Sequence, residues 1–597
     1  MRNLFHINKF LWSYKWRLLA GALFVVAQNF FRLLVPPQFR KALDLAATCL
    51  GEYRSAPNDE ERQVILDYIS MNLLEYGIWV IGFALIMGYF MFMMRKTIIV
   101  VSRLIEYDLR KVIFAHYENL DTAFYTRNST GDMMSRITED VSKVRMYLGP
   151  GLLYCINLVT LFILAIYYMY NVSPTLTFYA LIPLPILSVS IYIVSSIINK
   201  RSEVIQRQLA KLTTIAQEVY SGIRVVKSYV KEQQFVSYFT KESEEYKDNS
   251  MELAKVNALF FPLMLLLVST SILLVVIVGG QEVTKGNITH GNIAEFIIYV
   301  NMLTWPFTAV GWIVSIVQQA EASQGRINEF LKTIPTISNP NKDDIHIKGS
   351  VEFNQVSFTY KDSGTQALKD VSFSLKKGEK LGIIGKTASG KSTIASILLR
   401  MYDIDSGTVS VDGNNISELN LYQLRKKIGY VPQDAFLFSD TIERNIAFGK
   451  SDAAIDEIKD ITKNAAIYDD IMSLPEQFET MIGERGVTLS GGQKQRISLA
   501  RALIKEPDII ILDDCLSAVD TTTEQTILSY LSGALKDKTA IIITHRIYRH
   551  LDFDKVIVLD EGELVEQGTP SELMKAHGYY YEILTKQQDE EKVIEGQ

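Results

Sequence analysis

The chain has 597 residues, a formal net charge of −6, and 48% hydrophobic residues. This length allows roughly three or four domains of ordinary size, and so mild a charge points to no particular class of partner. Three cysteines, Cys49, Cys155 and Cys515, stand at unrelated spacings, which indicates neither a disulfide framework nor a cysteine-based metal site.

The N-terminal segment shows no cleavable signal peptide, because no short apolar core is followed by a small-residue cleavage site. Residues 1–12 instead mix aromatic and aliphatic side chains with Arg2 and Lys9. This mixture predicts a helix that lies in the membrane interface.

The first half of the chain is dominated by apolar stretches long enough to cross a bilayer as helices of about 20 residues. Six such windows lie near residues 17–37, 73–95, 150–170, 174–198, 257–280 and 292–318. The stretches 96–149 and 199–256 between them are charged, rich in Lys and Arg, and helix-patterned. The positive-inside tendency places both stretches and both termini in the cytoplasm, and the loop near 38–72 outside.

Polar and aromatic residues within the spans are candidates for lining a transport pathway. They are Gln28, Asn29, Arg32, Asn157, Asn301, Trp305 and Trp312. Each polar member of this set has an alternative role as a hydrogen-bonding contact between helices.

After residue 333 the pattern changes to alternating strands and helices, which predicts a mostly parallel sheet covered by helices. The expected strands are 351–360, 371–375, 380–384, 509–512, 540–544 and 555–559. We therefore divide the chain into a membrane domain (1–333), a linker (334–348), an α/β domain (349–586) and a polar, frayed tail (587–597).

A glycine-rich loop between an expected strand and an expected helix is the first motif with a clear chemistry. It consists of Gly385, Lys386, Thr387, Ala388, Ser389, Gly390, Lys391 and Ser392, with Thr393 in the following helix. Glycines let such a loop wrap phosphates, and amides at the helix N-terminus donate to them. Lys391 is expected to reach the β- and γ-phosphate oxygens, and Ser392 to bind Mg²⁺. The alternative is a tight strand-to-helix turn without a ligand.

Ser490, Gly491, Gly492 and Gln493 open a second helix, expected to run to Ala502. Because the chain already has a phosphate loop, another anion-binding helix end makes sense if it closes over a nucleotide held by a second subunit.

These residues resemble the motifs of the ATP-binding cassette (ABC) family, in which the second helix end is the signature motif and acts across a dimer interface. The other family positions are present in order: Tyr360 to stack on adenine, Gln433 in the Q-loop, 517–520 as the D-loop, and His545 as the switch histidine. The resemblance implies ATP and Mg²⁺ as cofactors, with Ser392, Gln433 and Asp513 around the metal and Asp514, Gln433 and His545 in catalysis. Ala388 stands where relatives often have a glycine, and its side chain is small enough to make this a minor departure.

Asp514 is the main departure from the family pattern, which has a glutamate there to orient or deprotonate the attacking water. An aspartate draws the carboxylate back by about 1.5 Å, and misplacement on this scale can cost on the order of 100-fold in rate. The alternative is that Asp514 is a shorter working base. With Ser490–Gln493 intact, the chain resembles the degenerate-site subunit of a heterodimeric exporter, most similar to Mdl-type multidrug-resistance-like bacterial half-transporters.

The resemblance implies an all-α six-helix transmembrane domain followed by an α/β P-loop nucleotide-binding domain of the ABC type. Residues 124–132 and 220–232 resemble the coupling helices that dock on the cassettes.

The leading hypothesis is ATP-driven export of hydrophobic or amphipathic compounds across the plasma membrane, which for a bacterial protein is the inner membrane. The partners would be a second half-transporter, membrane lipids and a hydrophobic small-molecule cargo, with no nucleic acid. The alternatives are a lipid or lipid-conjugate flippase, a slowly hydrolysing homodimer, and a regulatory or channel subunit that binds ATP and transports nothing.

Overall fold

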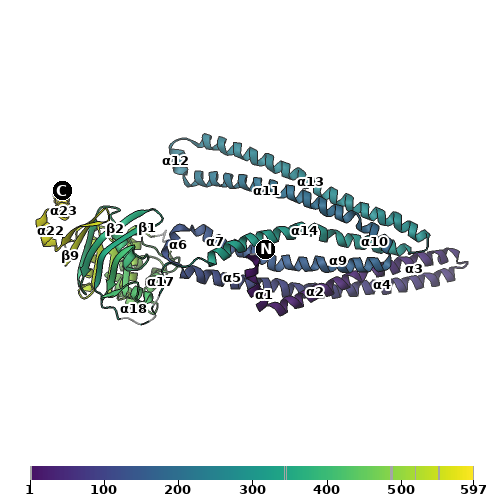
Figure 1. Cartoon of the computed structure of the whole chain (residues 1–597), viewed down its shortest axis with the longest axis horizontal. Helices are drawn as coiled ribbons and strands as arrows, with labels where there is room; N and C mark the ends of the chain where they lie inside the picture. The colour runs from purple at the N-terminus through teal and green to yellow at the C-terminus, as the bar shows by residue number, and fades with distance from the viewer. Residues whose placement is uncertain are drawn as a thin grey trace. The chain divides into compact units, whose positions relative to one another are not determined.

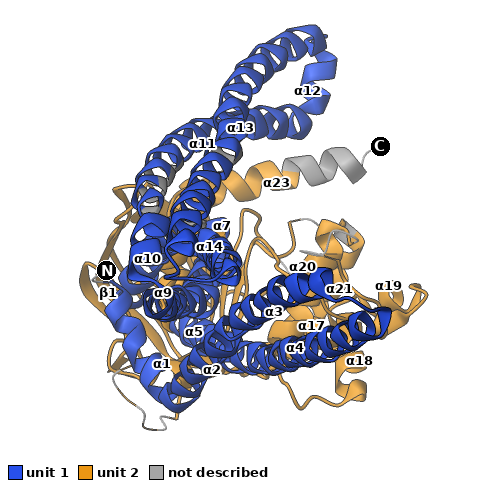
Figure 2. Ribbon diagram, turned by 90° about the vertical axis from the view of Figure 1, so that its right-hand side faces the viewer, with its two compact units in different colours: residues 1–118, 131–333 blue, residues 119–130, 334–597 orange. Residues whose placement is uncertain are grey.

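The structure is a computed structural model that describes residues 3–339, 341, 343, 346–483, 489–517, 519–548 and 551–595. The chain forms two compact units, coloured blue and orange in Figure 2. The first unit comprises residues 1–118 and 131–333, and the second comprises residues 119–130 and 334–597. A short segment from the middle of the helical half, 119–130, therefore belongs to the same unit as the C-terminal domain.

The first unit is built of helices (Figure 1). The α-helices are α1 (Asn8–Ser13), α2 (Lys15–Leu33), α3 (Val35–Ser55), α4 (Asp59–Met94), α5 (Val100–Asn119), α7 (Thr130–Ser135), α8 (Val141–Met146), α9 (Leu152–Val172), α10 (Pro174–Leu181), α11 (Pro183–Ser221), α12 (Ile223–Ser228), α13 (Glu232–Thr284) and α14 (His290–Leu331). A 3₁₀-helix, η1 (Asn3–Ile7), precedes them, and three π-helical turns lie between them: η2 (Arg95–Ile99), η3 (Arg136–Asp140) and η4 (Tyr147–Gly151).

Five helical runs among the described residues are long and apolar enough to cross a membrane. They are Lys15–Ser55, Asp59–Asn119, Thr130–Val172, Glu232–Thr284 and His290–Leu331, and they contain five of the six windows expected from the sequence. The sixth window, 174–198, covers α10 and the first part of α11, where several side chains lie outside the described ones. The charged stretches 96–149 and 199–256 are helical almost throughout, as predicted.

One of the candidate pathway residues, Asn29, connects two helices instead. Its side chain is fully buried, and its amide donates to Thr160 Oγ1 at 2.6 Å and to the Asn157 carbonyl at 3.3 Å. These contacts join α2 to α9, which matches the alternative role expected for polar residues inside a membrane. Trp305 and Trp312 on α14 are 51% and 43% exposed, so their rings remain on the surface of the unit.

The C-terminal domain contains two sheets where the sequence indicated one. Strands β10 (Glu563–Gly568), β9 (Lys555–Asp560), β3 (Lys380–Gly385), β8 (Thr539–Ile543), β7 (Ile509–Asp513) and β6 (Ile428–Val431) form a sheet in this order, parallel except for β10. The second sheet is antiparallel and has the order β2 (Thr365–Leu375), β1 (Val351–Tyr360), β4 (Ser406–Val411) and β5 (Asn414–Asn415).

The prediction that strands 351–360 and 371–375 join the mostly parallel sheet was therefore wrong. Strands β1 and β2 pair directly, with Tyr360 opposite Thr365, across a tight turn at 361–364. A parallel pair needs a long crossover, whereas an antiparallel pair needs only such a turn.

Strand β7 is buried on both faces. Ile509 and Ile511 pack in one hydrophobic core, while Ile510 and Leu512 pack in the other. Because successive side chains point to opposite faces, a strand covered on both sides needs a continuous apolar run. The run ends at Asp513, so the sheet carries Asp513 and Asp514 to the carboxyl edge of its parallel strands.

Helices and short turns complete the second unit. They are α6 (Thr122–Arg127), α15 (Lys391–Leu398), α16 (Leu421–Lys427), α17 (Ile442–Ala447), α18 (Ile455–Asn464), α19 (Tyr468–Met472), the 3₁₀-helix η5 (Gln477–Glu479), α20 (Gly491–Leu503), α21 (Thr521–Ala534), α22 (Pro570–Ala576) and α23 (Tyr579–Glu595). The C-terminal tail is helical where fraying was expected, because α23 continues through it to Glu595.

Candidate nucleotide-binding site

The glycine-rich loop connects β3 to α15 in a conformation that requires glycine at two places. Gly385 has φ +155° and Gly390 has φ +97°. A Cβ atom at Gly385 would lie 2.1 Å from the Leu559 carbonyl oxygen, and one at Gly390 would lie 2.2 Å from the Ala367 carbonyl oxygen. No larger residue fits either position, so the backbone of this loop is held against its neighbours and α15 begins at Lys391.

Ala388 adopts a left-handed conformation, with φ +65°. The sequence indicated that its small side chain makes this departure from glycine a minor one. The structure shows a cost of another kind, because a left-handed backbone costs an L-residue about 1–2 kcal/mol whatever the size of its side chain.

Replacing Ala388 with glycine is expected to raise the unfolding midpoint of the cassette, since glycine adopts this φ without strain. Part of the gain is offset by the greater entropy of glycine in the unfolded chain, which leaves a net effect of about 1 kcal/mol or less. Thermal unfolding of the full chain, followed by a signal from the cassette, measures the shift. Ala388→Val, which keeps the strain and adds bulk, should lower the midpoint; a rise would contradict this account.

Lys386 and Lys391 lie in the same loop and point to different surroundings. The Lys391 ammonium is buried and donates to the carbonyls of Gly385 at 2.8 Å and Lys386 at 2.6 Å. Burial lowers the pKa of Lys391, and the neighbouring carboxylates of Asp514 and Asp513 oppose that shift. The Lys386 ammonium instead pairs with Asp560 at 3.0 Å, and its side chain is 62% exposed. Only Lys391 is therefore positioned to meet phosphate oxygens inside the loop.

Ser392 and Asp513 bring two oxygen donors together at the start of α15. The Ser392 hydroxyl donates to Asp513 Oδ1 at 3.0 Å, and Asp513 is buried at the end of β7. Burial and the repulsion of Asp514 raise the pKa of Asp513, whereas the hydrogen bond from Ser392 and the charges of Lys391 and His545 lower it. The net shift of this pKa is upward. A hydroxyl and a carboxylate are hard oxygen ligands of the kind Mg²⁺ takes, together with phosphate oxygens. These residues therefore fit a magnesium ion.

Asp514 follows directly and has a left-handed backbone, with φ +46°. Its amide donates to the Ile543 carbonyl at 2.8 Å, which fixes the residue to the end of β8. Burial raises the pKa of the Asp514 carboxyl, while His545 and Lys391 lower it. The Asp514 carboxylate thus lies near Lys391 and His545, beside the position expected for the phosphates.

A cavity of about 280 Å³ collects these residues at the carboxyl edge of the parallel sheet. Its lining contains most of the predicted nucleotide residues: Tyr360, Thr387, Ala388, Ser389, Gly390, Lys391, Ser392, Thr393, Gln433, Asp513, Asp514 and His545. The side chains of Thr365, Ala367 and Ile543 also line it and were missed, because nothing in their local sequence distinguishes them from ordinary strand residues.

Two details of the lining support a ligand with phosphates. The Ser389 hydroxyl is buried and has no hydrogen-bond partner among the described residues. Buried polar groups without partners are rare, so a ligand atom at this place would satisfy it. The Tyr360 hydroxyl contacts Thr393 Oγ1 at 3.2 Å, which holds its ring beside the loop.

Ser490, Gly491, Gly492 and Gln493 lie outside this cavity. Ser490 caps α20: its hydroxyl accepts from the Gln493 amide at 3.2 Å, and the Gln493 side chain accepts from the Ser490 amide at 3.0 Å. The side chain of Gln493 also donates to Asp470 at 2.9 Å. Ser490 and Gly491 are exposed, so this helix end is formed and open to solvent.

Comparison with known proteins identifies the family of the chain. Residues 18–307 match the family described as "ABC transporter transmembrane region", and residues 368–517 match the family described as "ABC transporter". The chain is 39% identical to the "Probable multidrug resistance ABC transporter ATP-binding/permease protein YheI" of Bacillus subtilis over 82% of this chain and 84% of the relative. The chain belongs to the ABC transporter family.

Two further relatives carry the name "Multidrug resistance-like ATP-binding protein MdlA". The protein from Escherichia coli is 33% identical over 81% of this chain and 82% of its own length. The protein from Buchnera aphidicola subsp. Schizaphis graminum is 32% identical over 97% of each chain. This ABC transporter chain is therefore a helical membrane domain fused to a cytoplasmic cassette that binds and hydrolyses ATP, as the resemblance implied.

Helix α6 of this ABC transporter chain is docked on the cassette, within the second unit. Arg127 pairs with Asp362, and Thr122 Oγ1 donates to the Met401 sulfur at 3.5 Å. Asp121 caps α6 by accepting from the Phe124 amide at 3.1 Å and also accepts from the Thr336 amide at 2.6 Å. The first of the two predicted docking segments thus contacts the domain that holds the nucleotide cavity.

Proposed function

We propose that the chain is one half of an ATP-driven exporter of hydrophobic or amphipathic compounds in the bacterial inner membrane. The observation that carries this proposal is the docking of α6 on the cassette through Arg127, together with the bond of Asp121 to Thr336 in the linker. Residues 119–130 lie in sequence between α5 and α7 of the membrane domain, so movement of the cassette would pull on both helices. Relatives with multidrug resistance in their names support the choice of cargo class.

We further propose that the working assembly is a heterodimer in which this chain carries the weaker ATP site. Two features support this arrangement: Asp514 occupies the position of the family's glutamate, and the Ser490 helix end is formed, exposed and away from its own cavity. The Ser490 helix end would close over the partner's nucleotide, while the partner's equivalent would close over Lys391.

Within this site, the chain's own residues would hold and orient the substrate. Lys391 and the loop amides would bind phosphates, Tyr360 would stack on adenine, and Gln433 and His545 would position water and the γ-phosphate. Ser392, Asp513 and Gln433 would hold Mg²⁺, which would supply positive charge to offset the charge that develops on the phosphates. Asp514, being one methylene short, would place its carboxylate too far back for efficient attack by water.

The function is tested in inside-out vesicles that contain the chain together with its partner subunit. We expect ATP-dependent accumulation of a lipophilic fluorescent dye. Vanadate should stop this accumulation, and a protonophore should not. ATP-dependent movement of a fluorescent phospholipid between leaflets, without dye uptake, would instead identify a flippase. ATP turnover with neither dye accumulation nor phospholipid movement would contradict export and favour a regulatory subunit.

Asp121→Ala is the matched variant for this assay, because it removes the cap of α6 and its bonds to Thr336 while leaving the nucleotide cavity untouched. Losing an N-cap costs about 0.5–2 kcal/mol, and the lost hydrogen bonds to Thr336 add to this cost. We expect dye uptake to fall at least fivefold while basal ATP turnover stays within about twofold. An equal loss of dye uptake and ATP turnover would show that α6 does not couple ATP turnover to transport.

A further inference from the structure

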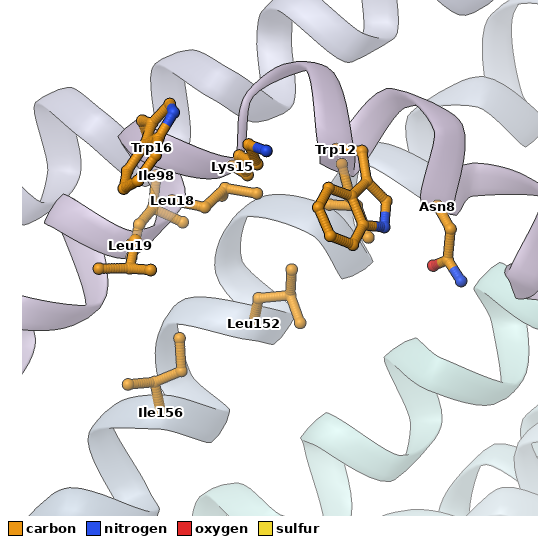
Figure 3. A pocket seen from close by; sticks show the side chains of 10 residues that line it. Asn8, Trp12, Lys15, Trp16, Leu18, Leu19, Ile98, Leu152 and Ile156 are labelled. Atoms are coloured by element: carbon orange, nitrogen blue, oxygen red, sulfur yellow. The ribbon is translucent and has the colours of Figure 1, made fainter.

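An apolar groove of about 640 Å³ lies beside the N-terminal helices, and neither the nucleotide site nor the coupling contact uses it. Figure 3 shows Trp12 of α1 and Leu19 of α2 on one side, with Leu152 and Ile156 of α9 on the other. A pocket for a drug-sized or lipid-chain ligand typically has a volume of roughly 300–1,000 Å³. The groove is therefore large enough for part of an acyl chain.

The groove is placed at one surface of the membrane. Lys15 begins the first membrane-crossing run, Lys15–Ser55. Trp12 and Trp16 on either side of it are 68% and 75% exposed, and Leu19, one turn further on, is 63% exposed. Tryptophan collects at the level of the lipid headgroups, and the positive-inside tendency puts this end on the cytoplasmic side. The open groove thus faces the inner leaflet.

Lys15 supplies the only charge among the ten described residues that line the groove. Its ammonium lies 4.8 Å from the centre of the Trp12 ring and 5.8 Å from that of Trp16, and it makes no ion pair among the described residues. Two indole faces hold a cation well, so Lys15 is positioned at the mouth of the groove. On α5, Asp108 accepts a hydrogen bond from Tyr14 at 3.0 Å.

An apolar groove with the single positive charge of Lys15 at its mouth is complementary to a molecule with an apolar chain and a negatively charged headgroup. We infer that this groove binds an anionic phospholipid of the cytoplasmic leaflet, with its phosphate beside Lys15 and an acyl chain along Leu19, Leu152 and Ile156. A zwitterionic lipid offers the same phosphate but adds a quaternary ammonium, which the cation at the mouth repels. The inference does not depend on which compound the transporter exports.

The test uses the full chain reconstituted in phosphatidylcholine vesicles with increasing fractions of dibrominated phosphatidylglycerol or dibrominated phosphatidylcholine. Bromine quenches tryptophan fluorescence on contact, and subtracting a Trp12→Phe/Trp16→Phe variant isolates these two from the five tryptophans of the chain. One lysine near an anionic surface contributes about 1 kcal/mol, which corresponds to about a fivefold preference. We expect that preference for phosphatidylglycerol in the wild-type chain and none in Lys15→Gln.

Lys9→Gln is the matched control, because Lys9 is an exposed lysine of the preceding helix, α1, that does not line the groove. It should keep the full preference. Equal quenching by both lipids in the wild-type chain, or an unchanged preference in Lys15→Gln, would overturn the inference. Absence of quenching by either lipid would also overturn it, by showing that protein covers the groove. Native mass spectrometry gives a second readout: the wild-type chain should retain more phosphatidylglycerol than Lys15→Gln does.

Discussion

Asp514→Glu is expected to raise the ATP turnover of the purified chain, studied without a partner, by about 100-fold. In a homodimer of this chain both cavities contain Asp514, and both are closed by an intact Ser490 helix end. The added methylene moves the carboxylate toward the position where water attacks, while Lys391, Gln433 and His545 stay in place. Steady-state phosphate release at saturating ATP measures the change.

Two further variants show whether the gain arises as proposed. Asp514→Asn keeps the shape of the side chain and removes its charge, so turnover should fall to the background. Asp514→Glu combined with Ser490→Arg should lose the gain, because Ser490 lies outside its own cavity and is proposed to act on the nucleotide of the other subunit. If the wild-type chain already hydrolyses ATP at a rate typical of transporters and glutamate changes nothing, Asp514 is a shorter working base and the degenerate-site proposal fails.

Lys391→Met is expected to weaken ATP binding by about 100-fold, because hydrogen bonds to charged groups contribute about 1.5–3 kcal/mol. The Lys391 ammonium is buried within the loop and has only backbone carbonyls as hydrogen-bond partners among the described residues, so the phosphates would be its charged partner. Displacement of a fluorescent ATP analogue from the full chain measures the affinity.

Lys386→Met is the matched control for that experiment. It removes the same charge from the same loop, but the Lys386 ammonium is exposed and paired with Asp560. We expect less than a twofold change in ATP affinity. Equal losses in the two variants would mean that the loop acts through its total charge, and not through the position of Lys391.

Much of the site was predictable because its motifs are local. Glycines at positions that exclude a Cβ, a helix beginning at Lys391 and a capped helix at Ser490 all follow from residues within a few positions of each other. Strand 351–360 was predicted with the bounds that β1 has, since its alternation and length are visible in the sequence. The cavity then collects residues from several strand ends, as expected for a parallel sheet.

Other features depend on neighbours far away in the chain. Strand β1 pairs with β2 because a tight turn connects the two strands. Periodicity alone does not show this pairing and assigned β1 to the wrong sheet. The left-handed φ of Ala388 is not visible from its residue type. The different surroundings of Lys386 and Lys391 come from an ion pair with the distant Asp560 for the first and from the loop's own carbonyls for the second. Asn29 was a pathway candidate until Thr160 and Asn157 proved to be its partners.

The sequence by itself determined the order of spans and motifs, the nucleotide chemistry and the shortened carboxylate at Asp514, because periodicity, composition and residue type are properties of neighbouring residues. Only the tertiary structure decided that residues 119–130 belong with the cassette and that Ser490 lies apart from its own phosphate loop. The physical reason is that such placements are fixed by hydrogen bonds and ion pairs between distant segments, such as Asp121 with Thr336 and Arg127 with Asp362, which leave no local pattern.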